Sequence, residues 1–77
     1  MQTSISVKLF ATLNRYTPDA SDNYSVRPGT TIRDLMEQLG VPEAEVRLIF
    51  IDGVKGNLSS VLHGGERVGI FPPVGGG

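Results

Sequence analysis

The 77-residue sequence has few side chains that could perform chemistry. It contains no cysteine, so it has neither a thiol nucleophile nor a thiolate metal ligand. His63 is the single histidine and the one candidate general base, and Ser59 and Ser60 are near it in sequence. It stands in a glycine-rich turn, where a histidine is far more often a solvated surface residue. We therefore predict no catalytic residue within the chain.

Two further patterns resemble ligand sites but lack residues that such sites require. Asp19 and Asp22 form a carboxylate pair, but the loop has too few other ligands for a Ca²⁺ site. The segment 64–69 is rich in glycine, but it lacks the lysine and the strand–loop–helix context of a phosphate-binding loop. We therefore predict no metal site and no bound cofactor.

The carboxylate of Gly77 is the remaining candidate for a reacting group. A partner could use ATP to convert it to an acyl-adenylate, whose acyl carbon sulfur or an amine could then attack. Gly75 and Gly76 precede it, and residues without side chains could thread into a narrow channel of that partner. The protein would then be a carrier or substrate rather than an enzyme. The alternative is that these glycines are a frayed terminus without function.

The elements that must position this tail can be predicted from the pattern of apolar residues. Residues 67–71 are expected to form a strand that Pro72 and Pro73 end, because proline cannot donate to a sheet ladder. Residues 4–9 alternate polar and apolar, as in a half-buried strand, and residues 24–27 form a second short strand. Residues 11–16 could form a helical turn.

The helix has the most complete set of signals. Thr31 is a suitable N-cap with Asp34 as its capping-box partner, Gly40 is a suitable residue after the C-terminus, and Pro42 prevents continuation. Between the caps an apolar stripe follows the helical spacing: Ile32, Leu35, Met36 and Leu39.

The second half of the chain predicts a hairpin and a final strand. Residues 47–51 form an apolar run typical of a buried strand, Asp52-Gly53 is a turn signal, and residues 54–58 are an expected edge strand. A second turn at residues 63–66 leads into the final strand. The predicted core is Ile5, Val7, Leu9, Ile32, Leu35, Met36, Leu39, Leu48, Phe50, Val68 and Ile70.

This element order predicts an α+β fold in which one helix covers a mixed four- to five-stranded sheet. It is the order of the β-grasp, or ubiquitin-like, fold, in which the last strand lies parallel to the first. We expect a domain over residues 1–74 and a glycine tail over residues 75–77.

Phe71 falls on the outward face of the last strand, and Phe10 falls on the outward side of the neighbouring first strand. An exposed aromatic cluster usually marks an interface. We therefore predict that a partner docks at Phe10, Phe71, Pro72, Pro73 and Val74. The alternative is that a loop covers both rings.

Charge and hydropathy limit the other partners. The net charge of −1 argues against nucleic acid, whose partners usually carry a basic stripe. No run approaches the ~18 apolar residues of a membrane span, and the first residues carry no secretory signal. We expect a cytoplasmic protein.

The final residues resemble a known family. The strand 67–71, the turn at Gly65-Glu66 and the ending Phe71-Pro72-Pro73-Val74-Gly75-Gly76 are similar to the ubiquitin-like sulfur carriers. Those carriers include the molybdopterin synthase small subunit and the thiamine-biosynthesis carrier. The Pro-Pro pair places the resemblance closest to the molybdopterin synthase small subunit.

The resemblance implies a mechanism and a set of partners. An E1-like adenylyltransferase would adenylate Gly77, a sulfur donor protein would convert it to a thiocarboxylate, and the molybdopterin synthase large subunit would use the sulfur. The chain departs from the family in ending with three glycines, so that Gly77 or a trimmed Gly76 could react, and in carrying Glu66 where aspartate is usual. A tungsten cofactor, a thiamine-type pathway, a ubiquitin-like protein modifier and a β-grasp binding module with an incidental tail remain alternatives.

Overall fold

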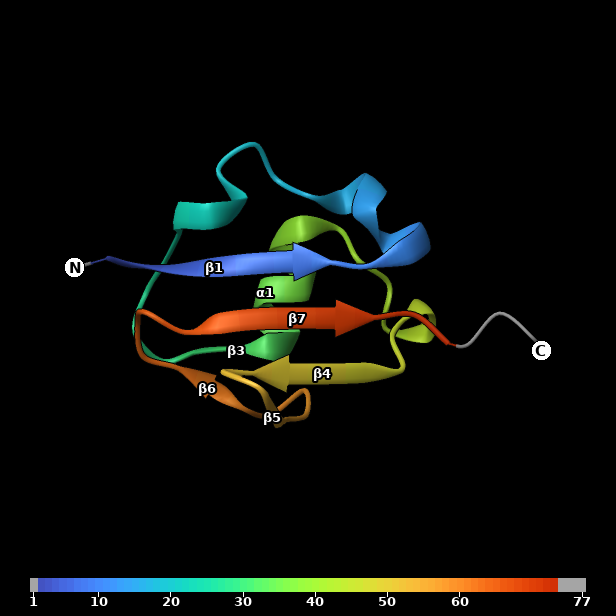
Figure 1. The fold of residues 1–77 in the computed structure, drawn as a ribbon. Helices are drawn as coiled ribbons and strands as arrows, with labels where there is room; N and C mark the ends of the chain where they lie inside the picture. The colour runs from blue at the N-terminus through green and yellow to red at the C-terminus, as the bar shows by residue number, and fades with distance from the viewer. Residues whose placement is uncertain (1, 74–77) are drawn as a thin grey trace.

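A mixed sheet packs against one α-helix in the computed structural model, which describes residues 2–73 (Figure 1). The strands are β1 (Thr3–Leu9), β2 (Tyr24–Val26), β3 (Thr30–Thr31), β4 (Leu48–Ile51), β5 (Val54–Lys55), β6 (Val61–Leu62) and β7 (Arg67–Phe71). The helices are α1 (Ile32–Leu39) and the 3₁₀ segments η1 (Ala11–Tyr16), η2 (Ser21–Asn23) and η3 (Glu43–Glu45).

The strand order confirms the predicted β-grasp fold. Five strands lie in the order β2-β1-β7-β4-β5, and β7 is in the centre. β7 runs parallel to β1 and antiparallel to β4, whereas β2 and β5 each pair antiparallel with their neighbour. A small second sheet, β3 with β6, was not predicted. β7 therefore carries the chain out of the middle of the main sheet (Figure 1).

The caps of α1 are those that the sequence predicts. The Thr31 hydroxyl accepts a hydrogen bond from the Asp34 amide at 3.1 Å, and the Asp34 carboxylate accepts one from the Thr31 amide at 3.2 Å. Gly40 ends the helix in the left-handed region at φ 80°. The stripe of Ile32, Leu35 and Met36 is buried, but Leu39 is only partly buried at the edge of the core.

The predicted face of β4 is wrong. Leu48 and Phe50 were expected in the core, but they are only half-buried, and Ile49 points inward with 5% of its surface exposed. Register explains the difference: Ile49 pairs with Ile70, whereas Phe50 pairs with Gly69 on the other face of β7. A continuous apolar run has no alternation, so it does not indicate which residues face inward.

The turns agree with the sequence signals. Asp52 and Gly53 have φ of 53° and 81° and join β4 to β5 through a two-residue turn, which positive φ at both positions favours. β5 is shorter than predicted and ends at Lys55. The helical turn expected at residues 11–16 is η1, whose Leu13 is buried. Within residues 2–73, no helix has the length and hydropathy needed to span a membrane.

Candidate functional site

Three phenylalanines gather on the face of the main sheet opposite α1. Phe10 and Phe71 are stacked, with ring centroids 4.1 Å apart and planes within 4° of parallel. Phe50 contacts Phe71 edge to face, at 5.7 Å and 86°. We call these three residues the aromatic cluster. It brings together the predicted docking residues Phe10 and Phe71 and adds Phe50, which sequence reasoning had placed in the core.

Gly69 provides the space in which the cluster assembles. It pairs with Lys8 on β1 and Phe50 on β4, so it lies between the rings. A Cβ atom at this position would lie 3.3 Å from Phe10 Cε2 and 3.7 Å from Phe71 Cε1. The missing side chain therefore lets the Phe10 ring lie low across β7 and reach Phe71.

The backbone beside Phe10 is strained. Ala11 has φ of 53°, a left-handed conformation that is unfavourable for a residue with a Cβ atom. The Phe10 amide donates to the Ile70 carbonyl at 3.1 Å, and the Phe10 carbonyl accepts from the Leu13 amide at 3.0 Å. The chain thus turns sharply from β1 into η1 while Phe10 stays attached to β7.

The cluster lines an open groove of about 580 Å³. Lys8 and Arg67 line the same groove, and so do Thr17, Ser21 and Asp22 from the connection between η1 and β2. All three rings are half-buried rather than enclosed. The connection from β1 to β2 therefore contributes to the groove but leaves the rings accessible.

The sheet holds the chain firmly up to the end of β7. The Phe71 carbonyl accepts a hydrogen bond from the Arg47 amide at 2.8 Å. Pro72 is half-buried and Pro73 is exposed, and the strand ends at Phe71, as predicted from the two prolines. Val74, Gly75, Gly76 and Gly77, which carry the predicted docking, threading and reacting roles, lie outside the described residues, as does the boundary of the predicted tail.

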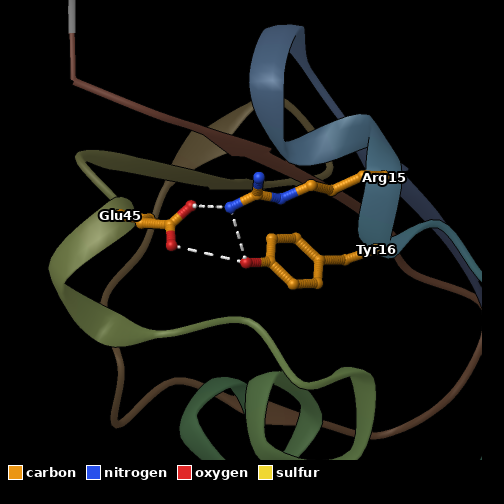
Figure 2. Close-up of polar contacts among 3 residues, drawn as sticks. All are labelled: Arg15, Tyr16 and Glu45. Carbon is orange, nitrogen blue, oxygen red and sulfur yellow. Dashed lines mark hydrogen bonds and ion pairs between the residues drawn. The ribbon is translucent and has the colours of Figure 1, made fainter.

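A polar cluster ties together the two 3₁₀ segments at this end of the sheet (Figure 2). Arg15 Nη2 donates to the Tyr16 hydroxyl at 2.9 Å and to Glu45 Oε1 at 3.1 Å, and the Tyr16 hydroxyl donates to Glu45 Oε2 at 3.3 Å. Figure 1 shows η1 and η3 near the end from which β7 exits. The contacts therefore link η1 to η3 beside that exit.

The residues first considered for catalysis are distributed over separate turns. His63 and Gly64 donate their amides to the Glu66 carboxylate at 2.8 and 2.7 Å, so Glu66 closes its own turn. Burial opposes ionisation of this carboxyl, but the hydrogen bonds from the His63 and Gly64 amides prevail and hold the pKa of Glu66 below its ordinary 4.5. Ser59 and Ser60 bond to Asn57 in another loop. Among residues 2–73, no three His, Cys, Asp or Glu side chains gather as metal ligands.

The fold and the position of the exit strand define a ubiquitin-like β-grasp protein. The sequence matches the family described as Mut7-C ubiquitin over residues 2–75, and the chain belongs to that family. A comparison with curated proteins finds no match.

Solved structures share the fold along nearly the whole chain. The HVO 2177 protein of Haloferax volcanii has a TM-score of 0.75 at 20% identity and covers 99% of this chain and 88% of its own. SAMP1 of the same organism has a TM-score of 0.67 at 22% identity, and the match covers 96% of this chain and 99% of SAMP1. A candidate molybdopterin converting factor subunit 1 of Pyrococcus furiosus has a TM-score of 0.65 at 25% identity, and the match covers 94% of this chain and 99% of the Pyrococcus protein. These matches agree with the resemblance to ubiquitin-like sulfur carriers.

Proposed function

We propose that this chain is a sulfur carrier whose Gly77 carboxylate is adenylated and then converted to a thiocarboxylate. One observation carries the proposal: β7, the central strand, ends at Phe71 inside the aromatic cluster, and six residues lead from there to Gly77. Six residues span at most about 21 Å. A partner that docks on the cluster would therefore have the Gly77 carboxylate within reach of its own active site.

The chemistry requires no catalytic side chain from this protein. A carboxylate oxygen of Gly77 would attack the α-phosphorus of ATP held by an E1-like adenylyltransferase, and pyrophosphate would leave. A hydrosulfide supplied by a sulfur donor would then attack the acyl carbon, AMP would leave with the shared oxygen, and a proton would be released. The product would be a thiocarboxylate, and ATP would be consumed on the partner rather than bound by this chain.

We infer a role in molybdopterin synthesis for the carried sulfur. In this scheme Gly75 and Gly76 would thread into the active site of a molybdopterin synthase large subunit, since only backbone has to pass. Phe71, Pro72, Pro73 and Val74 would dock beside its entrance together with Phe10. The similarity to the Pyrococcus furiosus protein supports this assignment, as does the ending Phe71-Pro72-Pro73-Val74. The reactions would take place in the cytoplasm.

The second candidate is a ubiquitin-like modifier joined through Gly77 to lysine side chains. A lysine amine would attack the same adenylate, so the two functions share their first step. Solved structures described as small archaeal modifier protein 1, at 20 to 22% identity, are the observation that favours it. A thiamine-type carrier would form the same thiocarboxylate and differ only in the acceptor.

Mass spectrometry tests the proposal in two stages. The intact mass of the protein from its own cells should correspond to a chain that ends at Gly77 or at a trimmed Gly76. Incubation with the E1-like enzyme of the same organism, ATP and sulfide should then replace one oxygen by sulfur in the C-terminal fragment. A longer natural chain, or an unmodified terminus beside a demonstrably active enzyme, would reject the carrier function. Mass ladders on other proteins would favour the modifier.

A further inference from the structure

The groove over the aromatic cluster combines an apolar floor with two cations. Lys8 lies on β1 and Arg67 on β7, and both side chains are exposed and line the groove with Phe10, Phe50 and Phe71. Within residues 2–73, neither Lys8 nor Arg67 has a carboxylate within ion-pair distance, whereas Arg15 and Arg33 each have one. The groove thus presents two cations that the described part of the chain does not neutralise.

The register places these two cations side by side. Ser6 pairs with Arg67 and Lys8 pairs with Gly69, so Lys8 and Arg67 are diagonal neighbours on adjacent strands. Diagonal neighbours are about 7 Å apart, within reach of two long side chains that converge on one group. The Asp52 carboxylate accepts from the Arg67 amide at 2.9 Å, which leaves the Arg67 guanidinium available. One carboxylate from outside could therefore bind both cations.

The distance between the two cations and the aromatic cluster determines how far apart the matching side chains of a bound segment must be. Phe10 follows Lys8 by two residues, just beyond the end of β1 at Leu9, and its backbone is still extended, so the two residues are about 7 Å apart along the chain. We propose that the groove binds a partner segment that presents an apolar side chain to Phe10 and Phe71 and, about 7 Å away, a carboxylate to Lys8 and Arg67. Two side chains on one face of an extended segment have this spacing.

The charge of the groove favours an acidic protein segment over a second copy of this chain and over a nucleic acid. A second copy of the chain, docked through the same face, would set the Lys8 and Arg67 pair against its own counterpart, and like charges across an interface are repulsive. A single-stranded nucleic acid would need a longer run of cations than the two that line this groove. An acidic and apolar protein segment fits both features of the groove.

A peptide titration tests the groove without reference to catalysis. The probes are three extended nonapeptides that carry leucine and, two positions later, glutamate, glutamine or lysine. Amide shifts of Lys8, Arg67 and Gly69 in the ¹⁵N-labelled protein should report binding of the glutamate peptide, with affinity about tenfold weaker for the lysine peptide. Equal affinities for the three, shifts centred elsewhere, or stronger binding of oligo-uridine RNA at these amides would overturn the proposal, as would dimerisation through this face.

Adenylation kinetics then identify the partner, and this step rests on the proposed function. Lys8→Glu/Arg67→Glu should raise the KM of the E1-like enzyme for the carrier about tenfold and leave kcat unchanged. Arg27→Glu/Arg33→Glu changes the charge equally at exposed positions outside the groove and should leave KM near wild type. Equal effects of the two double variants would overturn the proposed role of the cations. If the wild-type chain is never adenylated, the sulfur-carrier function is rejected instead. The peptide titration would still show whether the groove binds an acidic and apolar segment.

Discussion

The rings of Phe10 and Phe71 stack face to face across the parallel pair β1 and β7, and the absence of a side chain at Gly69 leaves room for them. The contact joins the first strand to the point where the last strand leaves the sheet. A stack of this kind contributes both packing and an accessible apolar surface. The variants that follow separate these two contributions.

Removal of the central ring should weaken docking more than folding. Phe71→Ala deletes the contacts with Phe10 and Phe50, each worth roughly 0.5–1.5 kcal/mol beyond area burial. Because the ring is half-buried, we expect a folded protein with reduced stability and a raised KM for adenylation. Urea unfolding and adenylation kinetics give the two quantities. Val61→Ala, at an exposed position of β6, is the control. If the Phe71→Ala protein fails to fold, the aromatic cluster is needed for folding and the docking prediction is contradicted.

Leu35 should be among the most sensitive positions of the core. Its side chain is fully buried under the sheet, so Leu35→Ala should lower the free energy of unfolding by roughly 2–5 kcal/mol. Leu39→Ala, on the same helix but only partly buried, should have a smaller effect. Urea denaturation of both variants measures the difference. Equal losses would mean that the burial of α1 is not as described.

Two adjacent glycines offer a matched pair in the turn before β7. Gly64→Ala would place a Cβ atom against the Thr3 side chain and impose a left-handed φ, so it should be strongly destabilising. Gly65→Ala is also strained, at φ 81° compared with 133° for Gly64, but its Cβ atom would have no atom within 4 Å, so it should lower the free energy of unfolding by roughly 1–2 kcal/mol. Thermal unfolding should place Gly64→Ala clearly below Gly65→Ala. The reverse order would contradict the described approach of this turn to β1.

Glu66 should make stability depend on acid pH. Because its pKa is below 4.5 in the folded state, the ionised carboxylate stabilises the fold above pH 4.5, and this stabilisation is lost as the pH falls through the folded pKa. Glu66→Gln cannot ionise, so its stability should be lower near neutral pH and should change less between neutral pH and acid. Urea midpoints over this range measure the effect. Asp19→Asn, at an exposed loop position, is the control. Parallel curves for Glu66→Gln and wild type would contradict the prediction.

The fold could be predicted from the sequence because its local signals agree with one another. The Thr31–Asp34 capping box, the Asp52-Gly53 turn and the alternation along β1 each define one element, and all are observed. The face of β4 could not be predicted, because Leu48 to Ile51 are all apolar and both parities satisfy a hydrophobic pattern. Only the register with β7, which puts Phe50 opposite Gly69, decides it.

The candidate site was predicted in part for the same reason. Phe10 and Phe71 stand out because polar alternation on their strands marks the outward face, whereas Phe50 is hidden in an apolar run. The strained backbone at Ala11 has no sequence signal, since alanine is not expected in a left-handed conformation. The diagonal placement of Lys8 beside Arg67 depends on the register between two parallel strands that are far apart in sequence.

The proposed reaction predicts that bulk near the terminus blocks activation and leaves the fold unchanged. Gly76 is five residues beyond the end of β7 at Phe71, so a side chain there should not alter the free energy of unfolding. In a narrow channel of the E1-like enzyme, however, each added carbon would have to be accommodated. The series Gly76→Ala, Gly76→Val and Gly76→Phe should lower the rate of thiocarboxylate formation in that order, with unchanged urea midpoints. Gln2→Val, at the other end of the chain and exposed, should have no effect on either measurement. A Gly76→Phe chain that is thiocarboxylated as fast as wild type would show that the terminus does not thread a channel.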